Sequence, residues 1–407
     1  MSGLDPVAEL KERLQRFPPD RYPVQHATAQ FHLGLALANA GEAGAAETAL
    51  AAAARLFDPE RLPVEHAKAL NALGAVLRLA GRLGEAAAAF RACAAAFGQA
   101  GGRLEEGAAA FNLGLVEREL GDVGTARAAL GRARGLLDPS RVPVQAAAAA
   151  RELGATLLQA GELEPAVAAL RDARALAEEA GDEVERGAAA NLLGLALLAR
   201  GDAQEAVDQL RAAAVANPRS IRPHAYAMAK ANLALAYERQ GEAARARVSA
   251  RQALGAPSPP EPVAVQASEL LDRLGRPVGD LVVLLAEEPR DRWPSLVREE
   301  LVRLADAQPP ERLAESAAWI EAQLASGPEG VELAEAWLAG LLELPPEQME
   351  RLIESALEAV AARGAGDGRR FRETVSQAAT HFHAPQLIRL EETFGRIGGE
   401  LAQDVWS

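Results

Sequence analysis

The chain has 407 residues, a formal net charge of −14 and a single cysteine. One cysteine excludes an internal disulfide framework, and the lack of any run of eighteen apolar residues excludes a membrane-spanning helix. The acidic excess argues against nucleic acid or an anionic membrane as a partner. The N-terminal stretch has no apolar signal-peptide centre, so we expect a cytoplasmic protein. The excess of arginine over lysine, with much alanine, glycine and proline, is typical of a GC-rich bacterial genome.

The charge is unevenly distributed along the chain. From residue 258 onward there are 27 acidic and 14 basic residues, so this part carries nearly all of the net charge. The prolines and glycine of "GAPSPPEP", residues 255–262, end a helix at this point. We therefore predict three parts: an N-terminal capping helix and lead-in over residues 1–24, a repeat region over residues 25–257, and an acidic, all-helical C-terminal domain over residues 258–407.

Residues 25–257 repeat with a period of forty residues. Each unit has a glycine inside a helical pattern, a second glycine seven residues later and an alanine five residues after that. The three series are Gly34, Gly74, Gly114, Gly154 and Gly194; Gly41, Gly81, Gly121, Gly161, Gly201 and Gly241; and Ala46, Ala86, Ala126, Ala166, Ala206 and Ala246. Such a period is typical of a solenoid, in which each unit buries its apolar face against its neighbours.

Each unit is predicted to form two helices. Leu70, Leu73 and Leu77 of the second unit share one helix face. The mid-helix Gly74 costs about 1 kcal/mol relative to alanine, so we expect the two helices to cross there too closely for a larger side chain. The second glycine, Gly81 in this unit, is expected to end the first helix in the left-handed conformation. The pattern predicts twelve helices between residues 25 and 254, preceded by one at residues 6–17.

These positions resemble the pattern of the tetratricopeptide repeat. The second unit supplies Leu73, Gly74, Leu77, Gly81, Ala86, Phe90 and Cys93, and the sixth supplies Tyr237, Gly241, Ala246 and Ala253. The period exceeds the usual length of about 34 residues and is similar to the repeats of kinesin light chain, rapsyn and the polarity scaffold that binds G-protein α subunits. The resemblance implies an all-α, right-handed superhelical solenoid of about six helix-turn-helix repeats, followed by the C-terminal helical region.

The same resemblance implies that a partner protein or peptide binds in a concave groove lined by the first helix of each repeat. The expected partner-binding residues are Phe31, Leu35, Lys68, Asn71, Arg78, Phe111, Leu115, Arg118, Arg151, Asn191, Leu195 and Arg239. Because apolar and basic side chains alternate there, we expect an apolar partner segment with interspersed acidic residues. The alternative is that the arginines are ordinary solvated residues and that Phe31 and Phe111 pack between repeats.

Three linkers carry a Pro-Val step before the next helix. They are "PPDRYPVQHA", "DPERLPVEHA" and "DPSRVPVQAA", which begin at residues 18, 58 and 138. Proline biases the residue before it away from helical geometry, so we interpret these linkers as structural spacers. A recurring ligand contact made by Arg21, Arg61 and Arg141 is the alternative.

Residues 258–407 also follow a helical pattern, but without the forty-residue register. In residues 349–360, for example, one apolar stripe runs along a predicted helix. We expect a helical bundle or degenerate helix pairs that extend the solenoid. The tryptophans are predicted to lie in its core, except Trp406, which is either docked or offered to a partner. The acidic surface is expected to bind a second protein or to fold back over the groove.

The sequence contains no phosphate-binding, zinc-protease or nucleophile-elbow motif. His381 and His383 point in different directions on a helix, and Glu373 or Glu391 would have to approach for a metal site to form. Cys93 is predicted to lie in the core. We therefore expect no enzyme activity, no metal and no cofactor.

The leading hypothesis is a non-catalytic scaffold or adaptor that binds other proteins. One alternative is a regulator whose solenoid changes conformation when it binds a peptide. A second is an enzyme or metal-binding protein formed by the C-terminal domain. Self-association through stacking of repeat ends is also open, since the last repeat has no obvious polar cap.

Overall fold

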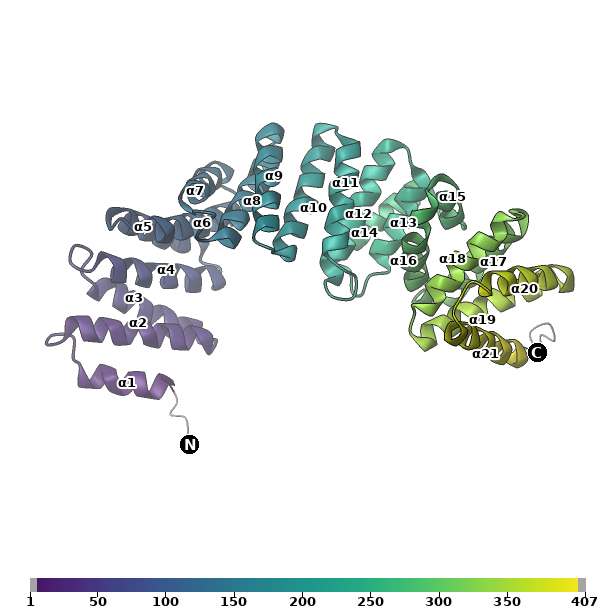
Figure 1. The fold of residues 1–407 in the computed structure, drawn as a ribbon. Coiled ribbons are helices and arrows are strands. Elements are labelled where there is room, and N and C mark those ends of the chain that lie inside the picture. Colours follow the sequence, from purple (N-terminus) through teal and green to yellow (C-terminus); the bar gives the residue numbers. More distant parts are fainter. Residues whose placement is uncertain (1–5, 402–407) are drawn as a thin grey trace. The chain divides into compact units, whose positions relative to one another are not determined.

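The computed structural model describes residues 6–401, which form α-helices and one short 3-10 helix and contain no strand (Figure 1). The chain forms two compact units, Met1–Asp202 and Ala203–Ser407. The predicted all-α repeat fold is confirmed, and the twelve helices expected between residues 25 and 254 are α2 to α13. None of the helices in the described range combines the length and apolar character that crossing a bilayer requires.

The first unit contains a capping helix, four helix hairpins and one further helix. Its helices are α1 (Pro6–Arg16), α2 (Pro23–Asn39), α3 (Ala43–Leu56), α4 (Pro63–Leu79), α5 (Leu83–Gln99), α6 (Arg103–Glu119), α7 (Val123–Leu136), α8 (Pro143–Gln159), α9 (Leu163–Glu179) and α10 (Glu183–Arg200). The pairs α2/α3, α4/α5, α6/α7 and α8/α9 pack as hairpins, and α10 packs on α8 and α9. Proline at the start of α2, α4 and α8 suits the first helical turn, where a backbone N–H has no partner to lose.

The mid-helix glycines lie where the two helices of a hairpin cross. A Cβ at Gly114 would lie 2.5 Å from Cγ of Leu130 and 3.3 Å from the carbonyl oxygen of Ala126. Gly34 and Gly154 meet a leucine in the same way, and Gly74 meets Phe90. The prediction of a close crossing is therefore confirmed for these four repeats.

The second glycine of each repeat adopts the left-handed conformation, as predicted. Its φ angle is +79° at Gly41, +84° at Gly121 and +79° at Gly241. In this conformation the backbone turns sharply out of the first helix, so the next helix begins within a few residues. An amino acid with a side chain is strained there, which explains why glycine recurs at this position.

Three other residues confirm a structural role. Nδ1 of His26 lies 2.7 Å from the carbonyl oxygen of Phe17, and Nδ1 of His66 lies 2.9 Å from that of Ala54. Both rings thus bind carbonyl groups at the C-terminal end of the preceding helix. Cys93 is fully buried, and burial raises the pKa of its thiol to about 12.

The second unit begins with the second helix of the fifth repeat and the hairpin of the sixth. Its helices are α11 (Ala203–Ala216), α12 (Pro223–Gln240), α13 (Ala243–Leu254), α14 (Glu261–Leu274), α15 (Asp280–Glu287), η1 (Arg290–Arg292), α16 (Trp293–Ala305), α17 (Pro309–Ala325), α18 (Glu329–Leu342), α19 (Pro346–Arg363), α20 (Ala365–Ala379) and α21 (Ala384–Glu400). α14 packs on both α12 and α13, and Nη2 of Arg273 bonds Oε2 of Glu238 at 2.9 Å. α14 therefore takes the place of the first helix of a further repeat, and the domain boundary at residue 257 stays a prediction.

The helices after α15 form two layers around one core. α16, α18 and α20 pack in sequence, as do α17, α19 and α21. Trp293, Trp319 and Trp337 are buried in this core, and the ring of Trp337 lies 6.2 Å from that of Phe371. The predicted core role of these three tryptophans is confirmed, whereas Trp406 lies outside the described residues.

Glu315, on α17, is a buried carboxylate without an ion pair to any residue in the range 6–401. Its Oε2 accepts a hydrogen bond of 2.9 Å from the backbone N–H of Gly279. Burial raises the pKa of this carboxyl group, although Gly279 and the nearby Arg251 and Arg303 act in the opposite direction. The folded protein therefore favours the protonated form of Glu315 more than the unfolded chain does.

We expect the substitution Glu315→Gln to stabilise the protein at pH 7. A raised pKa means that the contribution of Glu315 to stability is complete below about pH 4.3, the ordinary value for glutamate, and is lost as the pH rises through the folded-state pKa. Glutamine keeps the oxygen that accepts from Gly279 and carries no charge. Chemical denaturation of both proteins should show the variant's advantage at pH 7 shrinking toward pH 4; an advantage that does not change with pH contradicts this account.

Candidate partner-binding face

The first helices of the repeats in the first unit share one exposed face, which we call the first-helix face. On α2 it comprises Val24, Thr28, Phe31 and Leu35, and on α4, α6, α8 and α10 it comprises the residues at forty-residue intervals from these. Spacings of four, three and four residues place side chains above one another on a helix. The face therefore consists of four rows of side chains that run from repeat to repeat.

Two of these rows are apolar in every repeat of the first unit. One is Leu35, Ala75, Leu115, Ala155 and Leu195, and the other is Val24, Val64, Leu104, Val144 and Val184. Leu35 is 36% exposed, Val144 42% and Val184 58%. Exposed aliphatic side chains that recur in register form a continuous apolar surface, unlike the scattered single ones that are common on soluble proteins.

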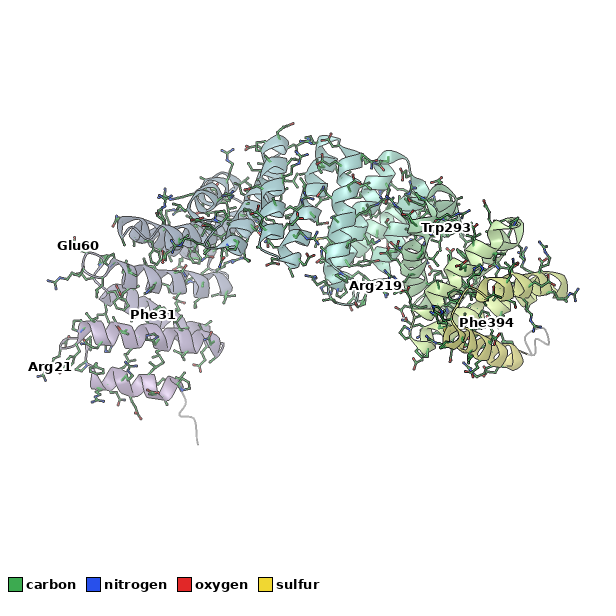
Figure 2. The ribbon with its side chains drawn as sticks, viewed as in Figure 1. Arg21, Phe31, Glu60, Arg219, Trp293 and Phe394 are labelled. Carbon is green, nitrogen blue, oxygen red and sulfur yellow. The ribbon has the colours of Figure 1, made fainter. Side chains whose placement is uncertain are left out.

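Phe31 and Phe111 lie between the two apolar rows and are half-buried. Phe31 (labelled in Figure 2) packs against residues of both the first and second repeats, including Ala27 and Ala69. Phe111 packs against residues of the third and fourth repeats, including Ala110 and Ala150. Both rings hold neighbouring repeats together, which leaves only part of each for a partner.

The arginines of the predicted groove are paired with glutamates. Nε of Arg78 bonds Oε1 of Glu119 on the next first helix at 2.9 Å. Arg118 pairs with Glu152 on α8. These two contacts link three successive repeats, because each arginine reaches a glutamate on the first helix of the following repeat.

Arg151 continues this series of ion pairs. Its Nη1 lies 2.6 Å from Glu152, and its Nε lies 2.5 Å from Glu185 on α10. Burial by itself would lower the pKa of Arg151, but the two glutamates outweigh it and raise the pKa. We call the chain of contacts among Arg78, Glu119, Arg118, Glu152, Arg151 and Glu185 the arginine–glutamate ladder. It neutralises most of the positive charge that we expected to find open to a ligand.

The remaining predicted site residues occupy different surroundings. Asn71 accepts a hydrogen bond of 3.2 Å from Asn112 of the next repeat. Lys68 is exposed on α4, and Asn191 is buried in α10. Arg239 is exposed near the end of α12, in the second unit, so the first-helix face of the first unit does not include it.

Two features of this face were missed in the sequence. The exposed valines of the second apolar row were interpreted as parts of spacers, although Val24, Val64 and Val144 stand in the shared Pro-Val steps. Glu152 and Glu185 were not assigned to the groove, although each lies 34 residues after the arginine that it binds. Pairs of opposite charge separated by nearly one repeat length are the signal that would have found the ladder.

The residues considered for metal binding do not form a cluster within the described range. Nδ1 of His381 lies 2.8 Å from Oε2 of Glu335 on the surface, and the backbone N–H of His383 bonds Gln386 at the start of α21. In residues 6–401 no group of three or more histidine, cysteine, aspartate or glutamate side chains is arranged to hold a metal ion.

The helix hairpins combine a forty-residue period, a glycine at each close helix crossing and a left-handed glycine before the second helix. The chain is a tetratricopeptide-like repeat protein. Neither a protein-family model nor a curated protein sequence matches it. The assignment to this repeat class therefore rests on the geometry of the chain itself.

Several solved tetratricopeptide-like structures are similar to this chain. The apo form of the quorum sensor NprR from B. thuringiensis is 12% identical over 91% of each chain, with a TM-score of 0.47. A putative kinesin light chain from Podosopora anserina is 19% identical over 54% of this chain and all of its own, with a TM-score of 0.39. The APC/C hetero-tetramer Cut9-Hcn1 gives 17% identity and a TM-score of 0.45; the match covers 67% of this chain and 46% of that one, so this chain spans about half its length.

Proposed function

We propose that this protein is a non-catalytic scaffold or adaptor that holds a segment of a partner protein on the first-helix face. The observation that supports the proposal is the pair of apolar rows, which recur in all five first helices of the first unit and include exposed leucine and valine side chains. Leaving such a surface in water is unfavourable by roughly 25 cal/mol for each Å² of apolar area. A partner segment that covers it recovers this free energy.

The arginine–glutamate ladder limits the role of charge in this binding. A carboxylate of the partner would have to share Arg78, Arg118 or Arg151 with the glutamate that already binds it. Partly exposed ion pairs contribute only about 0–1 kcal/mol each, so exchanging one for another changes affinity little. We therefore propose that apolar contacts supply most of the affinity and that acidic residues of the partner act mainly in fixing its register.

The partner segment should carry large apolar side chains that match the spacing of every second repeat. Leucine alternates with alanine along the row from Leu35 to Leu195, so the widest apolar contacts recur every eighty residues. Small residues at Ala75 and Ala155 leave room between them. An extended or helical segment with bulky apolar residues over the alanines fits this pattern.

The test compares a face variant with a matched control. The double variant Val144→Lys, Val184→Lys places two charges on exposed positions of the first-helix face. The double variant Ala128→Lys, Ala168→Lys places the same two charges on exposed positions of the second helices α7 and α9. We expect the partner captured by the wild-type protein from native cells to bind the face variant at least about tenfold more weakly, a loss of about 1.4 kcal/mol, and to bind the control unchanged.

Isothermal titration with the purified partner measures both affinities, and circular dichroism checks that both variants keep the helical content of the wild type. Equal binding to the two variants would place the partner elsewhere on the molecule. Loss of binding in the control alone would move the site to the second helices.

A further inference from the structure

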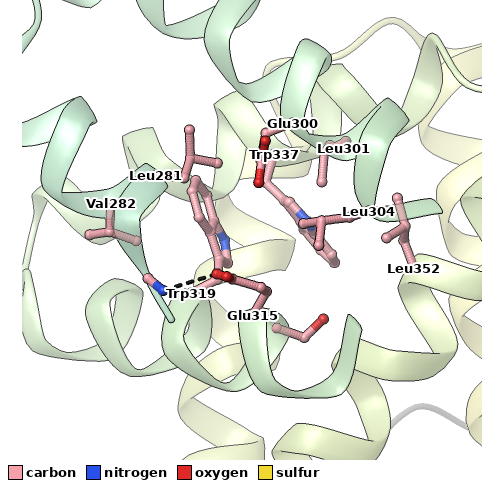
Figure 3. A pocket seen from close by; sticks show the side chains of 11 residues that line it. Leu281, Val282, Glu300, Leu301, Leu304, Glu315, Trp319, Trp337 and Leu352 are labelled. Carbon is pink, nitrogen blue, oxygen red and sulfur yellow. Dashed lines mark hydrogen bonds between the residues drawn. The ribbon is translucent and has the colours of Figure 1, made fainter. Parts of the chain in front are cut away.

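The second unit contains a small internal cavity that the scaffold role does not use. Leucines 281, 301, 304 and 352 line it together with Trp319, Trp337, Glu300 and Glu315. In Figure 3 the two indole rings stand on opposite sides of the cavity, and the carboxylates of Glu300 and Glu315 are turned toward the space between them. Its volume of about 30 Å³ is roughly twice the space that one ordered water needs.

The two carboxylates give this cavity an excess of negative charge. Glu300 is 2% exposed; its Oε1 accepts a 2.9 Å hydrogen bond from Nε of Arg303, and its Oε2 has no hydrogen-bond partner among the described residues. Glu315 is 9% exposed and accepts only the backbone N–H of Gly279. Arg303 therefore balances one of the two negative charges, and the other lacks a paired cation.

Retaining an unpaired carboxylate inside an apolar core is costly, because burial removes the water that would solvate the charge. Burial accordingly raises the pKa of Glu315. A glutamine or leucine at this position would avoid the cost. Buried charges of this kind are typical of sites that bind a ligand of opposite charge.

A larger cleft leads to the cavity. It has a volume of about 550 Å³ and shares Glu315 with the cavity. Its walls include the apolar side chains of Leu254, Leu271 and Val278, and Arg276 and Glu311 also line it. Volumes of this size are common for ligand-binding clefts, so a ligand has space for an apolar stem and for polar groups outside it.

We propose that the second unit binds a primary alkylammonium group, with its nitrogen between Glu300 and Glu315 and its methylene stem in the adjoining cleft. An ammonium group has three donors, which suit the free oxygen of Glu300 and the carboxylate of Glu315. The faces of Trp319 and Trp337 attract a cation. A guanidinium or a trimethylammonium group is too bulky for a cavity of this volume, which selects the small primary ammonium.

Two sources supply this chemistry: a lysine side chain of a peptide, and a free alkylamine. Titration of the full chain with N-acetyl-lysine methylamide and with butylamine tests both. The neutral isosteres N-acetyl-norleucine methylamide and butanol have the same stems without the charge. We expect both ammonium compounds to bind and both isosteres to bind at least tenfold more weakly.

The variant Glu315→Gln keeps the shape of the side chain and removes its charge, and Glu321→Gln is the matched control on the exposed face of the same helix, α17. We expect at least tenfold weaker ammonium binding for Glu315→Gln and unchanged binding for Glu321→Gln. Fluorescence of the buried tryptophans provides a second reading of occupancy. Tighter binding of the lysine compound identifies a peptide ligand, and tighter binding of butylamine identifies a free amine.

The proposal is wrong if wild-type protein binds neither ammonium compound, or binds the neutral isosteres equally well, because the cavity then holds only ordered water. Equal ammonium affinity in wild type and Glu315→Gln also overturns it. The wild-type comparison with the isosteres decides the question even if the variant does not fold.

Discussion

Replacing Gly114 by alanine is expected to destabilise the first unit, whereas the same replacement at Gly131 is expected to stabilise it. Both glycines lie inside helices, so each substitution gains about 1 kcal/mol of helix propensity. At Gly114 the new Cβ would lie 2.5 Å from Cγ of the buried Leu130. Overpacking of this kind typically costs about 1–3 kcal/mol, so the net result is a loss of up to about 2 kcal/mol.

Gly131, on α7, is the matched control because nothing lies within 4 Å of the position of its Cβ. Its substitution should therefore raise the free energy of unfolding by about 0.5–1 kcal/mol. Urea denaturation of the isolated variants, followed by circular dichroism, measures both changes. Stabilisation in both variants would show that the helices of this hairpin can move apart freely, and the account of the conserved spacing of these glycines would be wrong.

The forty-residue period predicted the repeat region well because its signals are local and recur. Gly41 and Gly121 mark the end of a first helix through a backbone conformation that only glycine adopts easily. Gly34 and Gly114 mark a helix crossing through the absence of a side chain. Each signal acts within one hairpin, so it can be recognised without knowing how distant parts of the chain meet.

The second unit was harder to predict because its contacts join segments that share no repeat. α14 continues the stacking of first helices, yet its sequence has no glycine at the crossing position to reveal this. The pairing of Glu315 with the backbone of Gly279 rather than with an arginine also depends on the packing of α15 against α17. Helical periodicity identifies the buried side of each helix but not the helix that covers it.

The candidate binding face was predicted in part. The residues chosen on the first helices, such as Leu35 and Leu115, do share one face with exposed apolar neighbours. The positive charge was overestimated, because an arginine seen alone in the sequence gives no sign that Glu152 or Glu185 lies beside it. Side-chain pairing between repeats depends on the rotation of one repeat relative to the next, which the period does not fix.

Substituting Asp280 by alanine is expected to have the largest effect of any single change considered for the second unit. Asp280 is 2% exposed at the start of α15 and binds two arginines of α13. Its Oδ1 lies 2.5 Å from Nη2 of Arg247, and its Oδ2 lies 2.7 Å from Nη2 of Arg251. Alanine leaves both guanidinium groups largely buried without a counter-charge, which costs about 3–5 kcal/mol.

Asp272→Ala is the control, because Asp272 pairs with Arg276 and the two side chains are 70% and 56% exposed. An exposed pair of this kind contributes about 0–1 kcal/mol, so the control should unfold almost as the wild type does. Chemical denaturation at pH 7 gives both free energies of unfolding. Equal small losses in the two variants would show that water reaches Arg247 and Arg251 in the folded protein.

The cost of losing Asp280 is not the same quantity as the stability that its ion pairs provide. The triple variant Asp280→Leu, Arg247→Met, Arg251→Met removes all three charges and keeps apolar side chains of similar length. Because desolvation of buried charges offsets much of their attraction, this variant should lose far less stability than Asp280→Ala alone. If it loses as much, the ion pairs themselves hold α15 on α13; if it loses little, the role of the charges is to select this docking of the two helices over others.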